Sequence, residues 1–161
     1  LSREEFLQPA AEAKPPVAGL SLRTAAASDL KRLFPLQRSY ELEEVIIPPG
    51  RFNEQVCLAS LRKTLRNQIM VMAELEGCAV AKAGTNARGF EVDQIGGVYT
   101  MQSLRNRGVG HLLMRVLLGK IFREKKAACL FVKRTNLPAL ALYRGLGFRT
   151  TEGYRISYYR P

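Results

Sequence analysis

Residues 105–110, RNRGVG, lie between an expected strand and the start of an amphipathic helix. Gly108 and Gly110 have no side chains, so the backbone can approach a ligand closely there. The unpaired amides of a first helical turn and the helix dipole attract anions, especially phosphate, and Arg105 and Arg107 add positive charge. The spacing is neither the Walker GxxxxGK(S/T) pattern nor the dinucleotide GxGxxG pattern. The stretch therefore predicts a different phosphate-binding loop or, alternatively, a turn that only punctuates the fold.

The segments after this loop predict a parallel crossover. From Val109 onward, apolar residues recur on one face of a helix, and ACLFV at 128–132 has the unbroken apolar character of a central strand covered on both faces. Asn136 is placed to cap a further helix that Gly147 ends. A final aromatic strand is expected at 154–159.

The segments before the loop predict two helices followed by an antiparallel meander. Glu76-Gly77 suits the turn of a first hairpin, and a second turn is expected near 86–89. The expected strands are 21–25, 69–75, 78–85 and 90–101, and the expected helices run from Ser28 or Asp29 to Val45, stopped by Pro48, Pro49 and Gly50, and from Asn53 to Leu65. The order βααβββαβαβ predicts an α/β domain with a mixed sheet.

Four motifs in register resemble the GNAT superfamily, the GCN5-related N-acetyltransferases. RNRGVG matches the family's (R/Q)xxGx(G/A) pyrophosphate loop, and IGGVYTM, LFVKRTN and NLPALALYRGLGF follow the family's order over residues 94–148. The element order extends the resemblance to about 20–161. It implies a mixed, mostly antiparallel twisted sheet with a splayed parallel central pair, flanked by about four helices, and acetyl-coenzyme A as cosubstrate without a metal.

The resemblance also implies the cofactor contacts. The strand before the loop would pair through exposed backbone groups with the pantetheine arm and the acetyl carbonyl, and Gly96-Gly97 fits the bulge that such a splay needs. Asn136 matches a cofactor-contacting asparagine, although helix capping alone would also explain it. The implied cofactor-binding residues are Val98, Tyr99, Thr100, Arg105, Asn106, Arg107, Gly108, Val109, Gly110 and Asn136.

Tyr143 matches the family tyrosine that acts as a general acid. Amine attack on a thioester builds a tetrahedral intermediate, and its collapse expels a thiolate that a nearby acid should neutralise. An ordinary aromatic core residue is the alternative interpretation. The setting ALYRGLGF favours the catalytic role.

The general base stays unassigned, because the sequence departs from the family at two positions. Where some members carry a glutamate, this chain has Phe131 or Gln94, and neither is a useful base at neutral pH. The remaining candidates, each of which could act through a water, are Glu43, Glu44, Glu91 and Asp93. The one histidine, His111, suits anion contact or surface exposure better than catalysis.

Composition and length limit the alternatives. The chain has 161 residues, enough for one domain, and 47% hydrophobic content, enough for a packed core. One histidine and three cysteines without CxxC spacing argue against a zinc site, and the unpaired cysteine count favours a reducing, cytoplasmic compartment. No apolar run is long enough for a membrane span. We expect residues 1–19 to be a linker or tail and 20–161 the acetyltransferase domain, with a further domain upstream in a longer protein.

The net charge of +11 has two interpretations. A basic surface can bind nucleic acid, but the excess is dispersed along the chain and no basic-aromatic module is present, so this partner ranks last. Coenzyme A is itself polyanionic, and the same field would favour neutral or acidic acceptors over strongly cationic ones.

The sequence thus predicts an N-acetyltransferase that moves acetyl, rather than aminoacyl, from acetyl-coenzyme A to a primary amine by direct attack in a ternary complex. The alternative is a non-catalytic sensor domain that binds coenzyme A or its acetyl form. The sequence does not identify the acceptor substrate, and it is compatible with either a monomer or a homodimer.

Overall fold

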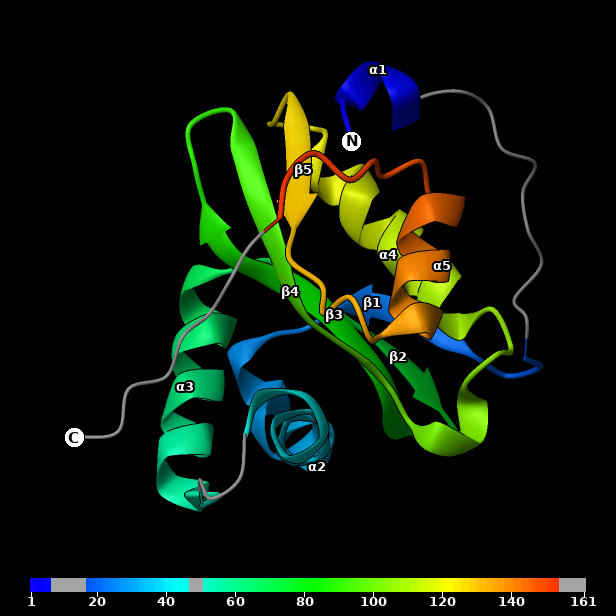
Figure 1. The fold of residues 1–161 in the computed structure, drawn as a ribbon. Coiled ribbons are helices and arrows are strands. Elements are labelled where there is room, and N and C mark those ends of the chain that lie inside the picture. The colour runs from blue at the N-terminus through cyan, green and yellow to red at the C-terminus, as the bar shows by residue number, and fades with distance from the viewer. Residues whose placement is uncertain (7–16, 47–50, 154–161) are drawn as a thin grey trace.

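A five-stranded sheet in the order β1-β2-β3-β4-β5 forms the centre of the computed structural model, which describes residues 1–6, 17–46 and 51–153. The first four strands pair antiparallel, and β4 and β5 pair parallel. Helices α2 and α3 cover one face of the sheet, and α4 and α5 lie on the other (Figure 1). The strands are β1 (Ser21–Thr24), β2 (Met70–Leu75), β3 (Cys78–Arg88), β4 (Val92–Thr100) and β5 (Ala127–Leu130). The helices are α1 (Arg3–Phe6), α2 (Leu30–Tyr40), α3 (Glu54–Asn67), α4 (Val109–Ile121) and α5 (Leu137–Gly145), with short turns η1 (Ala27–Asp29), η2 (Glu41–Val45) and η3 (Gln102–Leu104).

The meander is confirmed, with one turn displaced. Glu76 and Gly77 both have positive φ, as a two-residue hairpin turn of the favoured hand requires. The second hairpin extends further than expected, because β3 continues to Arg88 and the turn lies at 89–91. The core on the α4 side is made by one face of that helix, where Leu113, Met114, Leu117, Leu118 and Ile121 are fully buried.

The first predicted helix runs through Val45, but its last turn is π-helical. Residues 30–40 form α2, and η2 continues the helix through Val45 with Ile46 bonding back to the Glu41 carbonyl. A π-helical turn rotates the residues that follow it and is frequent at functional sites. The wider turn therefore changes the direction in which the three glutamates of η2 project.

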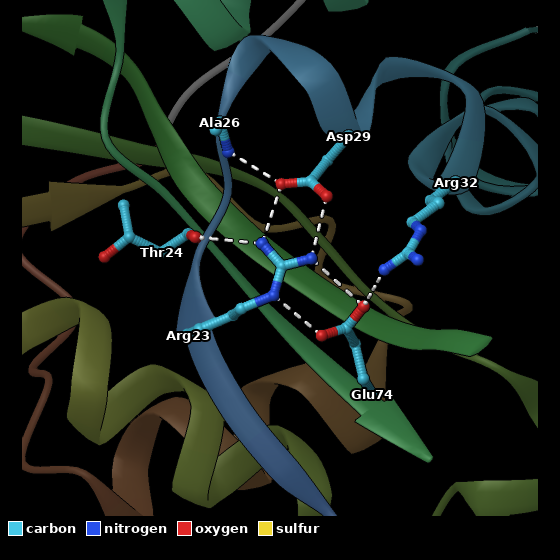
Figure 2. Close-up of polar contacts among 6 residues, drawn as sticks. All are labelled: Arg23, Thr24, Ala26, Asp29, Arg32 and Glu74. Atoms are coloured by element: carbon cyan, nitrogen blue, oxygen red, sulfur yellow. Dashed lines mark hydrogen bonds and ion pairs between the residues drawn. The ribbon is translucent and has the colours of Figure 1, made fainter. Parts of the chain in front are cut away.

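A charged cluster anchors the start of α2 to the sheet (Figure 2). Arg23 of β1 bonds both oxygens of Asp29 at 2.7 Å and reaches Glu74 of β2 at 2.7 Å. Asp29 also accepts from the Ala26 amide at 2.8 Å. These hydrogen bonds, with Arg23 the largest contributor, lower the pKa of Asp29 to about 2.

We expect Asp29→Asn to destabilise the fold by about 2 kcal/mol at neutral pH, because an amide cannot accept both arms of the guanidinium. Since folding lowers the Asp29 pKa from its usual value of 3.8, the stability that this cluster contributes is present above about pH 4. This stability is lost as the pH falls toward about 2. The difference in the free energy of unfolding between wild type and Asp29→Asn should therefore become smaller there.

Urea unfolding at several pH values measures this effect. Glu124→Gln is the matched control, since Glu124 is 64% exposed in its 2.7 Å pair with Arg88 and should cost under about 0.5 kcal/mol. Equal losses in the two variants would contradict the anchoring role of Asp29.

One sequence expectation needs correction, and two lie outside the described residues. Residues 1–6, within the expected linker or tail, contact the domain: Leu1 and Arg3 bond backbone groups of 126–128, and the Phe6 and Phe122 ring centroids are 5.1 Å apart. Strand β5 is last in the described sheet order, and its Cys129 is exposed, so coverage on both faces is wrong there, because an unbroken apolar run does not report which neighbours exist. The predicted stop at 48–50 and strand at 154–159 fall outside the described residues.

Candidate active site

Strand β4 carries a bulge where Gly96-Gly97 predicts one. Lys82 pairs with Tyr99 and Gly84 with Gly96, so β4 has one more residue than β3 between these two pairs. Gly97 takes up the extra length with φ +63°, a left-handed conformation that favours glycine. The bulge turns the peptide between Gly97 and Val98 out of the regular ladder.

Beyond this point β4 and β5 separate. Their parallel pairing runs from Val92 and Ala127 to Ile95 and Leu130, and β4 then continues to Thr100 without a ladder partner on its β5 side among the described residues. Figure 1 shows the chain leaving β5 toward α5 at this end of the sheet. The region between β4 and the β5–α5 connection, which we term the wedge, therefore has no strand paired with the β5-side edge of residues 96–100 among the described residues.

The RNRGVG loop lies at the end of the wedge and opens α4. Gly108 is the N-cap of α4 with φ +77°, and Asn106 is also left-handed with φ +60°. The first helical hydrogen bond runs from Leu112 to the Gly108 carbonyl, so the amides of residues 109–111 have no acceptor within the helix. These amides at a helix N-terminus suit a phosphate group.

The two arginines of the loop differ in their settings. Arg105 turns back toward the sheet: its Nε donates to the Thr100 carbonyl at 3.0 Å and its Nη2 to Glu43 at 2.6 Å, and the guanidinium lies over the Tyr99 ring. Arg107 is exposed on the loop. Of the two predicted phosphate ligands, Arg107 is the one whose position leaves it available to an anion.

Glu43 of η2 forms hydrogen bonds with both strand β4 and the RNRGVG loop. Its carboxylate accepts from the Tyr99 hydroxyl at 2.6 Å and from Arg105. Burial would raise the pKa of Glu43, but the hydrogen bonds from Arg105 and Tyr99 outweigh it and hold the pKa below its usual value. Glu43 is thus ionised but weakly basic.

Glu44 contacts the other side of the wedge. It accepts from the Asn136 side chain at 3.2 Å, and Lys133 donates to its backbone carbonyl at 2.6 Å. Asn136 caps α5 by accepting from the Ala139 amide at 3.1 Å, so the capping interpretation of Asn136 is confirmed. Its amide nitrogen faces the same turn η2 that holds Glu43.

Tyr143 reaches from α5 toward α2. Its pKa is raised to about 12, first by burial and then by Tyr40 and Glu44, which belong to the other face of the sheet. Burial raises the pKa of Tyr40, and the nearby backbone of Gly97 lowers it in part. Tyr143, Tyr40 and the bulge therefore gather at the wedge, and Tyr143 keeps its proton at neutral pH, as a general acid must.

The remaining candidates lie elsewhere or have different surroundings. Glu91 lies just before β4 and Asp93 near its start, at least three residues from the bulge. Glu91 pairs with Lys126, and Asp93 is buried beside Arg88. His111 lies at the surface. Partial desolvation of its ring and the positive charge of Arg115 lower the pKa of His111. Only Glu43 and Glu44 of the predicted bases are near the wedge. Gln94 pairs with Cys129 before the strands separate, and Phe131 is 59% exposed.

The sequence interpretation missed one buried residue at the bulge. Lys82 of β3 is 1% exposed and donates to the Gly97 carbonyl at 2.7 Å. A single lysine within the small apolar run AVAKAG is the signal that could have pointed to it, because a lysine is almost never fully buried without a partner.

Comparison with known proteins decides the family. The model of the acetyltransferase (GNAT) family matches residues 32–148, more than half of the chain. The chain belongs to the GNAT family. Acetyltransferases of this family take acetyl-coenzyme A as cosubstrate, and the loop, bulge and separating strands described above all lie inside the matched range.

Solved structures show the same fold at low sequence identity. A possible acetyltransferase from Clostridium difficile 630 matches with a TM-score of 0.70 at 16% identity, covering 88% of this chain and 98% of that one. A predicted acetyltransferase with acetyl-CoA from Clostridium acetobutylicum gives 0.70 at 18%, covering 86% and 96%. An aminoglycoside N-acetyltransferase in complex with CoA gives 0.69 at 19%, covering 92% and 99%. No curated protein sequence matches this GNAT chain.

The described residues contain neither a membrane-spanning helix nor a cluster of metal-binding side chains. Within 1–6, 17–46 and 51–153, no helix has the length and apolar character needed to cross a membrane. The same part of the chain holds no group of three or more His, Cys, Asp or Glu side chains arranged to bind a metal.

Proposed function

We propose that this protein is an N-acetyltransferase that transfers acetyl from acetyl-coenzyme A to a primary amine. The observation that carries the proposal is the wedge itself: the strands part at the bulge, and the anion-binding end of α4 lies beside the opening. The Clostridium acetobutylicum and aminoglycoside acetyltransferase structures, solved with acetyl-CoA and CoA, support this choice of ligand. The unpaired cysteines favour a reducing compartment, so we place the reaction in the cytoplasm.

Different segments of the protein would bind different parts of acetyl-coenzyme A. Amides 109–111 and Arg107 would hold the pyrophosphate, while the backbone of residues 98–100 would pair with the pantetheine arm. The Val98 amide, next to the bulge, would donate to the thioester carbonyl. Asn136 would add a side-chain contact at the start of α5.

The reaction proceeds by direct attack. The neutral acceptor amine adds to the thioester carbon, and the new C–N bond places negative charge on the carbonyl oxygen, which the Val98 amide stabilises. The intermediate then breaks its C–S bond, and Tyr143 gives its proton to the departing thiolate. The surplus proton of the amine passes to Glu43 or Glu44, directly or through a water, and the tyrosinate is reprotonated from solvent.

An acceptor screen tests transfer against the sensor alternative, which the low pKa of Glu43 and the non-carboxylate Gln94 and Phe131 favour. Release of free thiol from acetyl-coenzyme A is measured with a broad panel of small amines, peptide amines and protein lysines. Acceptor-dependent thiol release supports the enzyme. Tight acetyl-coenzyme A binding with no release in any sample would instead identify a sensor.

Arg107→Ala should weaken binding of coenzyme A about tenfold at low salt, because a charged contact to the pyrophosphate is lost. The difference from wild type should shrink as salt rises and screens the interaction. Titration calorimetry at two salt concentrations measures both effects. Arg123→Ala, an exposed arginine beyond the far end of α4, is the matched control. An unchanged dissociation constant for Arg107→Ala would remove Arg107 from the phosphate site.

A further inference from the structure

Lys82 is a buried amine that takes no part in the proposed reaction steps. It lies near the middle of β3, its side chain is enclosed, and its Nζ is 2.7 Å from the Gly97 carbonyl oxygen and 4.6 Å from the Tyr40 ring centroid. Burying an amine costs free energy unless its environment repays that cost. A hydrogen bond to the bulge and a contact with an aromatic face are the observed compensation.

The hydrogen bond from Lys82 acts on one particular peptide. The carbonyl of Gly97 and the amide of Val98 belong to the same planar, resonance-stabilised unit. A donor on the carbonyl oxygen draws electron density toward it, so the amide at the other end becomes a stronger donor. The ring of Tyr40 in α2 packs against the same ammonium group, 4.6 Å from Lys82 Nζ, so α2 helps to hold the side chain that bonds the bulge.

We propose that Lys82 is a positioning residue for acyl transfer: it orients and polarises the Gly97–Val98 peptide so that the Val98 amide donates to the thioester carbonyl. The inference rests on the proposed function, because it needs an acyl group in the wedge. Lys82 itself touches neither cosubstrate, and it acts through the backbone. Free coenzyme A lacks the carbonyl, so Lys82 should favour acetyl-coenzyme A over coenzyme A.

The charge of Lys82 makes this preference depend on pH. Burial lowers the pKa of Lys82 to about 7, although the negative charge of Glu41 in η2 raises it in part. Burial raises the pKa of Tyr40, and it raises the pKa of the Cys57 thiol to about 12, so both facing groups stay neutral near pH 7. Over this range Lys82 is therefore the member of the cluster that loses its charge, and a neutral amine polarises the peptide less than an ammonium.

The experiment compares the affinities of acetyl-coenzyme A and coenzyme A by calorimetry. In the wild-type protein the ratio of the two affinities should fall about fivefold between about pH 6 and about pH 8.5. Lys82→Met, which keeps the length of the side chain, should lower the affinity for acetyl-coenzyme A about fivefold at pH 6, leave that for coenzyme A unchanged, and abolish the pH dependence of the ratio. Lys125→Met is the control, because Lys125 also donates to a glycine carbonyl, Gly89, but at the far end of the sheet.

Each outcome has a distinct meaning. A pH-independent ratio in the wild type, or equal losses for both ligands in Lys82→Met, would overturn the positioning role while leaving the proposed function intact. A wild-type protein that binds neither ligand would overturn the proposed function itself. Because the wild-type pH series needs no variant, the inference stays testable even if Lys82→Met fails to fold.

Discussion

Tyr143→Phe should lower kcat for acetyl transfer about 100-fold, while the dissociation constant for acetyl-coenzyme A changes less than about twofold. The variant removes only the hydroxyl that we propose as the proton donor to the departing thiolate. It keeps the ring that packs edge-on against Phe148 at 6.0 Å, so the fold should be preserved.

The measurement is steady-state kinetics beside calorimetry on the same preparation. Parallel losses in kcat and in cofactor affinity would show that Tyr143 supports the structure of α5 rather than the chemistry. A full rate in Tyr143→Phe would mean that solvent, or another acid, protonates the thiolate.

Gly97→Ala should lower kcat/KM for acetyl-coenzyme A about 30-fold. The left-handed φ of +63° is strained for alanine, and the added methyl group would lie 3.2 Å from Lys82 Nζ. Relief of that strain rotates the Gly97–Val98 peptide, and the Val98 amide then no longer faces the developing oxyanion.

Gly119→Ala is the matched control for this substitution. Gly119 lies inside α4, and a methyl group added there would contact nothing within 4 Å, so alanine should be neutral or slightly stabilising. Kinetics and thermal unfolding of both variants are compared with the wild type. Wild-type kcat/KM in Gly97→Ala would contradict the role of the bulge in acyl transfer.

Local signals predict much of the framework around the site. The bulge at the glycine pair in β4 and the Asn136 cap each depend on a few neighbouring residues, so the sequence predicts them correctly. The left-handed Asn106 is also local, but asparagine adopts that conformation only sometimes, and the sequence interpretation weighed the glycines alone.

Local sequence signals do not predict contacts between distant segments. Arg105 and Glu43 are 62 residues apart, and their pairing depends on the π-helical turn that aims η2 at the loop. Arg105, which the sequence predicts as a phosphate ligand, is therefore paired with Glu43, one of the candidate general bases. Lys82 shows the same limit, because its hydrogen bond depends on which carbonyl of β4 lies within reach in the sheet register.

The site also qualifies the expectation drawn from the net charge. Although the chain carries +11, the wedge is bordered by Glu43 and Glu44 of η2. Both carboxylates contact basic side chains, Arg105 and Lys133 respectively. Local pairing, rather than the mean charge of the surface, therefore sets the field that an acceptor amine would meet.

Titration calorimetry of the wild-type protein with acetyl-coenzyme A at physiological salt tests the wedge as a cofactor site most directly, with adenosine diphosphate and plain salt as comparisons. We predict micromolar binding of one acetyl-coenzyme A per chain and much weaker binding of adenosine diphosphate, which lacks the pantetheine arm and the acyl group. No detectable heat from a folded sample would contradict the account, and the roles proposed for Tyr143, Arg107 and the bulge would fall with it.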